Sequence, residues 1–246
     1  MRAIWNFISS TGDSEPVFSG GRHVRPLTVV RSARARHMKL MVDPRDGNVR
    51  LTLPRRAGLA EARRWAESKR GWIEAQLAAL PAPQPIEPGM ALSVAGQALH
   101  LDWHQRHPRK PAIVETALQI GGPRESLDTR LLRWLKAEAQ GLLARESGHY
   151  AAKAGVSLGR IGVGDPVSRW GSCAASGDIR YSWRLILAPD HVRQATVAHE
   201  VAHRVHMNHG PAFHALVAEL YGADPAPARR WLRVHGPQLH WFGRAS

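Results

Sequence analysis

The sequence predicts an α+β fold: an N-terminal antiparallel β-rich part with one helix, followed by a mainly helical part that carries an edge strand. Runs in which apolar and polar residues alternate are concentrated in the first half of the chain, as expected for half-buried strands. The turn-forming segment D-P-R-D-G-N over 43–48 separates two of these runs and predicts a hairpin. Longer runs with apolar residues at helical spacing follow in the second half.

Three parts are expected along the chain. Residues 1–21, punctuated by Gly, Ser and Pro, predict an arm, residues 22–122 a β-rich subdomain, and residues 123–246 a helical subdomain. The β-rich subdomain should contain one helix over 58–80, followed by a stiff proline-rich linker over 81–88. Its strands are expected over 27–32, 37–42, 49–53, 92–94, 99–103 and 112–120.

The helical subdomain should begin with a long helix from Leu127 to about Gly148, for which Ser126 can serve as the cap. Alternation over 178–187 predicts a strand with one buried face. Asp190 is expected to cap the helix that follows this strand. Shorter elements are expected over 158–163, 215–221 and 225–233.

Composition and charge narrow the class of protein. The formal net charge of +14 arises from 34 Lys and Arg against 20 Asp and Glu. This excess suits a nucleotide, or weak association with nucleic acid through a basic surface, but the even spread of basic residues favours ordinary solvated faces. The single cysteine, Cys173, excludes an internal disulfide and fits a reducing compartment. Because no stretch approaches the ~20 apolar residues of a membrane span, we expect a cytoplasmic protein with no membrane partner.

The strongest motif is H-E-x-x-H over residues 199–203. Four residues are slightly more than one helical turn, so His199 and His203 lie on one face of a helix, about 6 Å apart along its axis. Two imidazoles placed in this way can bind one zinc ion. Glu200 lies beside them, near enough to take a proton from a metal-bound water. The motif therefore predicts a catalytic zinc site, which needs a third protein ligand.

Three downstream residues are candidates for that third ligand. His206 shares the helix stripe but lies roughly 10 Å along the axis from the first histidine if the helix runs straight. Glu219 would suit a class of metalloprotease whose third ligand is a distant glutamate. We favour His209, because Asn208 before it is suited to a left-handed cap that ends the helix near Met207 and turns the chain back towards the zinc.

Two motifs carry a resemblance to a known family. The segment R-W-G-S-C over 169–173 is followed by a short strand segment, a proline, the H-E-x-x-H motif and then Asn208-His209 and Phe213. In this order they resemble the YgjP-like (DUF45) metallopeptidases, which are relatives of the SprT-like proteases. A weaker likeness covers about residues 27–80.

The resemblance implies a zinc-dependent metallohydrolase with a zincin-like catalytic core over 123–246. His199, His203 and His209 would hold Zn²⁺, and Glu200 would activate a zinc-bound water to hydrolyse a peptide bond. Some members of the family are described as nucleoside triphosphate (UTP) pyrophosphatases, so a nucleotide is the alternative to a peptide or protein substrate. A third possibility is a SprT-like protease that acts on nucleic-acid-bound proteins. A purely structural zinc site is disfavoured, because it would need a fourth ligand and no neighbouring base.

Substrate contacts are expected along the R-W-G-S-C motif. An edge strand beside the metal of a zinc protease often pairs with an extended substrate, and the resemblance places Trp170, Gly171 and Ser172 on such an edge. Gly171 would let another backbone approach closely. Arg169 is expected to hold a substrate carboxylate or phosphate, with a structural ion pair as an equally compatible role. Cys173 is expected to be a small buried residue rather than a zinc ligand.

Overall fold

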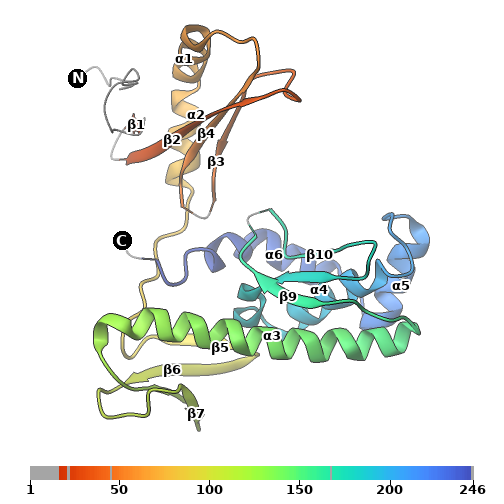
Figure 1. The fold of residues 1–246 in the computed structure, drawn as a ribbon. Helices are drawn as coiled ribbons and strands as arrows, with labels where there is room; N and C mark the ends of the chain where they lie inside the picture. The colour runs from red at the N-terminus through yellow and green to blue at the C-terminus, as the bar shows by residue number, and fades with distance from the viewer. Residues whose placement is uncertain (1–16, 21–22, 45, 167, 245–246) are drawn as a thin grey trace. The chain divides into compact units, whose positions relative to one another are not determined.

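The chain divides between Pro81 and Ala82 into two units, each with its own core (Figure 1). The computed structural model describes residues 17–20, 23–44, 46–166 and 168–244. Most of the predicted arm over 1–21 therefore lies outside the described residues, while Val17–Gly20 near its end form strand β1.

A four-stranded sheet in the order β1-β2-β4-β3 forms the N-terminal unit with two helices. Its central strand β4 (Val49–Pro54) buries every second residue, and it pairs with β3 as the predicted antiparallel hairpin. Strand β2 pairs with β4 in parallel, so the prediction of a purely antiparallel sheet is wrong. The reason is that β4 lies between β2 and β3. It is antiparallel to β3, its hairpin partner, and this leaves it parallel to β2. The other two strands are β2 (His23–Ser32) and β3 (Lys39–Val42).

Two helices, α1 (Leu59–Ser68) and α2 (Arg70–Ala78), replace the single helix predicted over 58–80. Lys69 between them has φ −100° and ψ 7°, which are not α-helical values, so the helix breaks there. Both helices still bury apolar side chains against the sheet. The core that they share consists of Leu27, Val49, Leu51, Leu53, Ala62, Ala66, Ile73 and Leu77.

The C-terminal unit begins with a second four-stranded sheet, in the order β5-β6-β8-β7. Its buried side chains share one core with the long helix α3 (Leu127–Ala154), so the unit starts at residue 82 and not at the predicted subdomain boundary of 122/123. Glu115, with a positive φ of 55°, divides the strand predicted over 112–120 into two. The strands are β5 (Ala91–Val94), β6 (Gln97–Trp103), β7 (Ala112–Val114) and β8 (Ala117–Ile120).

Helix α3 runs beside the helix of the H-E-x-x-H motif, α4 (Asp190–Ala202) (Figure 1). It continues past the predicted end near Gly148 and stops at Gly155, which adopts the left-handed conformation with φ 64°. The buried hydroxyl of Ser147 donates to the Leu143 carbonyl and lies 3.0 Å from the Tyr181 hydroxyl. The contact with Tyr181 ties α3 to a third sheet.

The third sheet has three strands in the order β10-β11-β9. Strand β11 (Ile179–Ser182) is central, antiparallel to β10 (Gly171–Cys173) and parallel to β9 (Ile161–Gly164). The strand predicted over 178–187 ends early, because Ser182 Oγ accepts a hydrogen bond from the Arg184 N–H and starts a 3₁₀ turn over Trp183–Leu187. One edge of the sheet is therefore β10, which carries the last three residues of the R-W-G-S-C motif.

An ion network joins α3 to α4. The Arg193 guanidinium, in a residue only 3% exposed, donates to the Glu146 carboxylate of α3 and to the Asp190 carboxylate of its own helix. Asp190 is the first residue of α4, so it does not cap the helix as predicted; Pro189 occupies the cap position. Helices α5 (Pro211–Tyr221) and α6 (Ala226–Leu239) complete the unit. Within the described parts of the chain, no helix is long and apolar enough to span a membrane.

Loss of the Arg193 network should destabilise the C-terminal unit. Glu146→Gln leaves the buried guanidinium with one carboxylate, and breaking a buried pair from one side typically costs about 3–5 kcal/mol. We expect denaturant titration followed by tryptophan fluorescence to show a free energy of unfolding lower by about 3 kcal/mol. The control Asp128→Asn removes an exposed pair with Arg124 and should cost under about 1 kcal/mol. Equal losses in the two variants would contradict this role.

Candidate metal centre

Helix α4 positions the H-E-x-x-H motif, because the apolar residues around the motif are buried in the main core. His199 is half-buried, Glu200 is buried, and His203 is the residue at which the helix ends. The helix therefore stops at Ala202, earlier than the predicted end near Met207. The apolar residues that anchor this end of α4 in the main core are Val197, Ala198, Val201 and Ala202.

His209 reaches the other two histidines through a loop. Among the described residues other than glycine, a positive φ occurs at Ala95 and Glu115 alone, so the prediction that Asn208 turns the chain in a left-handed conformation is wrong. Instead, the Gly210 N–H donates to the Asn208 carbonyl at 2.8 Å, and α5 begins directly afterwards with a proline. The loop is short enough to bring His209 beside α4.

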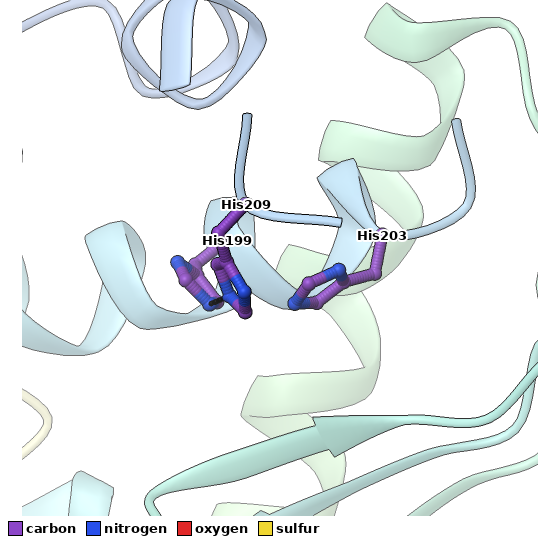
Figure 2. Close-up of side chains that lie close together, drawn as sticks. All are labelled: His199, His203 and His209. Carbon is purple, nitrogen blue, oxygen red and sulfur yellow. Dashed lines mark hydrogen bonds between the residues drawn. The ribbon is translucent and has the colours of Figure 1, made fainter. Parts of the chain in front are cut away.

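The imidazole rings of His199, His203 and His209 converge (Figure 2). One nitrogen of each ring can be chosen so that all three lie within 4.8 Å of one another. The Nε2 atoms of His199 and His209 are 3.2 Å apart. A zinc tetrahedron with Zn–N bonds of about 2.0–2.1 Å has edges of about 3.3 Å, which the separation of the His199 and His209 nitrogens matches, and imidazole nitrogen is a ligand type that zinc prefers.

Phe213 of α5 holds the three rings in place. Its side chain is fully buried, and its ring centroid lies 4.9 Å from that of His199, 4.6 Å from that of His203 and 4.7 Å from that of His209. The sequence motif included this phenylalanine without indicating a role. Its place in the structure is that of a packing support that restricts how each imidazole can rotate.

The proton of His203 is placed by the backbone that follows it. Its Nδ1 lies 3.1 Å from the His206 carbonyl oxygen, which can only accept a hydrogen bond, so Nδ1 carries the proton. Nε2 then keeps its lone pair, as a metal-binding histidine requires. His206 therefore contributes its carbonyl, while its imidazole lies outside the cluster.

Burial keeps the imidazoles of His199 and His203 uncharged. Burial, followed by the neighbouring His203 and His209, lowers the pKa of His199 to about 4. Burial also lowers the pKa of His203, although the hydrogen bond to the His206 carbonyl partly raises it. Both rings are consequently neutral at pH 7, which is the state that binds a metal ion.

Glu200 is the buried carboxylate of the site, with 6% of its surface exposed. Burial raises its pKa to about 7, and the nearby Arg169 guanidinium partly counters this rise. Its side chain lies against Gly171 of β10: a Cβ at that position would be 2.5 Å from Glu200 Cγ and Oε1. The glycine of the R-W-G-S-C motif is therefore required by this carboxylate.

A pocket of about 260 Å³ opens beside His199 and Glu200, and Arg169, Trp170 and Gly171 line it. Trp170 is fixed behind the pocket by stacking on His240, with ring centroids 5.1 Å apart. Ser172 points to the other side of β10 and lines a different hollow. Arg229 of α6 also lines the pocket, which sequence reasoning missed because nothing distinguishes it from the other arginines of that helix.

The remaining candidate ligands lie outside the cluster. Glu219 is exposed on α5, and Cys173 is a half-buried free thiol whose pKa is raised by burial. Among the described residues, no further group of three His, Cys, Asp or Glu side chains converges as the three histidines do. The site thus offers three nitrogen ligands beside one carboxylate.

Comparison with known proteins agrees with this geometry. The family model described as the YgjP-like metallopeptidase domain matches residues 36–235. Neither the curated proteins nor the solved structures contain a match to the chain. The family name indicates a metal-dependent hydrolase, and the matched region includes the whole histidine cluster. The chain belongs to the YgjP-like metallopeptidase family.

Proposed function

We propose that the chain is a zinc-dependent peptidase with a zincin-like core, in which His199, His203 and His209 hold the ion and Glu200 is the base. The observation that carries this proposal is the convergence of three imidazoles beside a buried carboxylate. Three ligands, unlike the four of a closed structural site, leave a position open for chemistry. When bound, zinc would supply a Lewis acid for the scissile carbonyl and the attacking water.

Glu200 provides the proton transfers of the proposed reaction. Because burial raises its pKa to about 7, its ionised form is a stronger base than an exposed glutamate, and its acid form donates readily near neutral pH. Glu200 takes a proton from the attacking water and returns it to the leaving nitrogen. Gly171 contributes by leaving the space that this carboxylate occupies.

Strand β10 is suited to hold an extended substrate. The Trp170 carbonyl accepts from the Ser182 N–H, and the Ala174 N–H donates to the Asp178 carbonyl. By the alternation of an antiparallel ladder, the backbone groups of Gly171 therefore point away from β11, as do those of Cys173. Such groups pair with an added peptide strand. This pairing gives Gly171 its proposed backbone contact with the substrate, whereas Trp170 and Ser172 would contact the substrate through their side chains.

Hydrolysis of a nucleoside triphosphate is the alternative function. It is favoured by Arg169 and Arg229, which both line the pocket of His199 and Glu200 and are suited to bind phosphate oxygens. Assays of the purified, zinc-loaded chain with an unstructured protein and with a panel of nucleoside triphosphates separate the two functions. We expect proteolysis that a chelator abolishes and Zn²⁺ restores, whereas release of pyrophosphate without proteolysis would establish the alternative.

Metal content should depend on the three histidines. His203→Ala and His209→Ala should each reduce bound zinc from about one ion per chain to a small fraction, because two imidazoles hold zinc far more weakly than three. Elemental analysis after dialysis measures this. His206→Ala and Glu219→Ala are the controls and should keep their zinc. Retention by His209→Ala together with loss from Glu219→Ala would identify Glu219 as the third ligand.

Glu200→Gln should retain zinc and fold but lose about 10²–10⁴-fold in kcat/KM, the usual effect of removing a general base. Gly171→Ala should also lower kcat/KM, because the added methyl group collides with the Glu200 side chain. Gly148→Ala is its control, since an added methyl group there meets open space. Normal turnover by zinc-loaded Glu200→Gln would rule out this mechanism, and normal turnover by Gly171→Ala would rule out the role of the contact.

A further inference from the structure

The outer face of the β10-β11-β9 sheet is hollowed beside the metal centre. The inner face of its central strand carries Ile179 and Tyr181, which are buried in the core, whereas Arg180 is exposed on the outer face. The hollow has a volume of about 540 Å³, and Arg160, Arg169 and Arg180 line it. Of these arginines, only Arg169 also borders the catalytic pocket.

Small residues around Arg180 leave the hollow open. In the register of the sheet, Arg180 lies between Ser172 on β10 and Gly162 on β9. Its guanidinium extends over Gly164, where an added Cβ would lie 2.7 Å from Arg180 Nε. The floor is thus formed by backbone and small side chains, with a cation at its centre.

None of the three guanidinium groups forms a salt bridge or a side-chain hydrogen bond within the described residues, but Arg160 and Arg169 attract the nearby carboxylates of Asp178 and Glu200. Asp178 also lines the hollow, so its carboxylate offsets one of the three positive charges, and Asp165 lies nearby. Asp165 accepts hydrogen bonds from Arg184 Nε and Nη2, and Asp178 Oδ1 accepts one from the Arg160 backbone N–H. Three guanidinium groups against one carboxylate leave the lining of the hollow with a net positive charge, which is suited to carboxylates of a ligand.

Strand β10 separates this hollow from the catalytic pocket. Successive residues of a strand point to opposite faces: Gly171 faces the Glu200 side chain, and Ser172 lines the hollow. A peptide paired along β10 alternates in the same way. Every second side chain would face α4, and the side chains between them would face the arginines.

We propose that Arg160, Arg169 and Arg180 make the enzyme selective for acidic peptide segments, in which Asp or Glu recurs at every second position next to the cleaved bond. This inference rests on the proposed peptidase function and on pairing along β10. The charge of the hollow favours an anion, and the strand register brings alternate side chains of a paired peptide to it. A nucleoside triphosphate supplies the charge but has no extended backbone to pair with Gly171 and Cys173.

Binding of two matched peptides to the full chain tests the proposal. The zinc-loaded Glu200→Gln variant prevents turnover, and fluorescence anisotropy at low ionic strength compares fluorescein-labelled (Glu-Ala)₄ with (Gln-Ala)₄. We expect the Glu peptide to bind about tenfold more tightly, with a difference that shrinks as salt screens the exposed charges. Adding Arg180→Gln should bring the ratio close to one. Adding Arg133→Gln, the same charge change on the exposed face of α3, should leave it unchanged.

Equal affinities for the two peptides, or a ratio that Arg180→Gln leaves unchanged, would overturn the proposal. Tighter binding of inorganic triphosphate than of the Glu peptide, lost in Arg180→Gln, would assign the hollow to a phosphate chain instead. Cleavage assays with the unsubstituted enzyme separate this inference from the proposed function. Equal kcat/KM for both peptides would overturn the selectivity and leave the peptidase function intact. Cleavage of neither peptide, with selective binding retained, would overturn the function and support the acidic-peptide site.

Discussion

The contact between Glu200 and Gly171 is the constraint on which the site depends. The carboxylate of α4 occupies the space where any side chain at position 171 would lie, so the helix and the edge strand can approach this closely only with glycine there. That approach brings Glu200, His199 and the edge of β10 to one pocket. Trp170 supports β10 from behind, because its ring stacks on His240 and covers Gly236 of α6.

Packing and electrostatics act together at the histidine cluster. Phe213 restricts the three rings, and the carbonyl of His206 determines which nitrogen of His203 carries the proton. Burial lowers the pKa of His199 and raises that of Glu200, so it favours the neutral form of both side chains. A divalent cation would also keep the imidazoles neutral, because it binds that form, but it would favour the ionised form of the nearby carboxylate.

Features that depend on local periodicity were predictable from the sequence, and features that depend on tertiary contacts were not. The approach of His199 to His203 follows from helical spacing alone. The path of the chain to His209 does not follow from this spacing. Asn208 does not adopt the left-handed conformation, and α4 ends at Ala202, earlier than predicted. The parallel pairing of β2 with β4 and the place of Arg229 at the pocket likewise depend on which elements meet in space, which spacing along the chain does not encode.

X-ray absorption at the zinc edge of the metal-loaded full chain tests the central claim most directly, because it counts the ligands of the ion by type. An open site held by His199, His203 and His209 predicts three imidazole nitrogens and one further light atom at about 2.0–2.1 Å, without sulfur. A sulfur neighbour at about 2.3 Å would place Cys173 among the ligands. That result, or a shell of four imidazoles closed by another histidine, would contradict a catalytic centre built on three histidines.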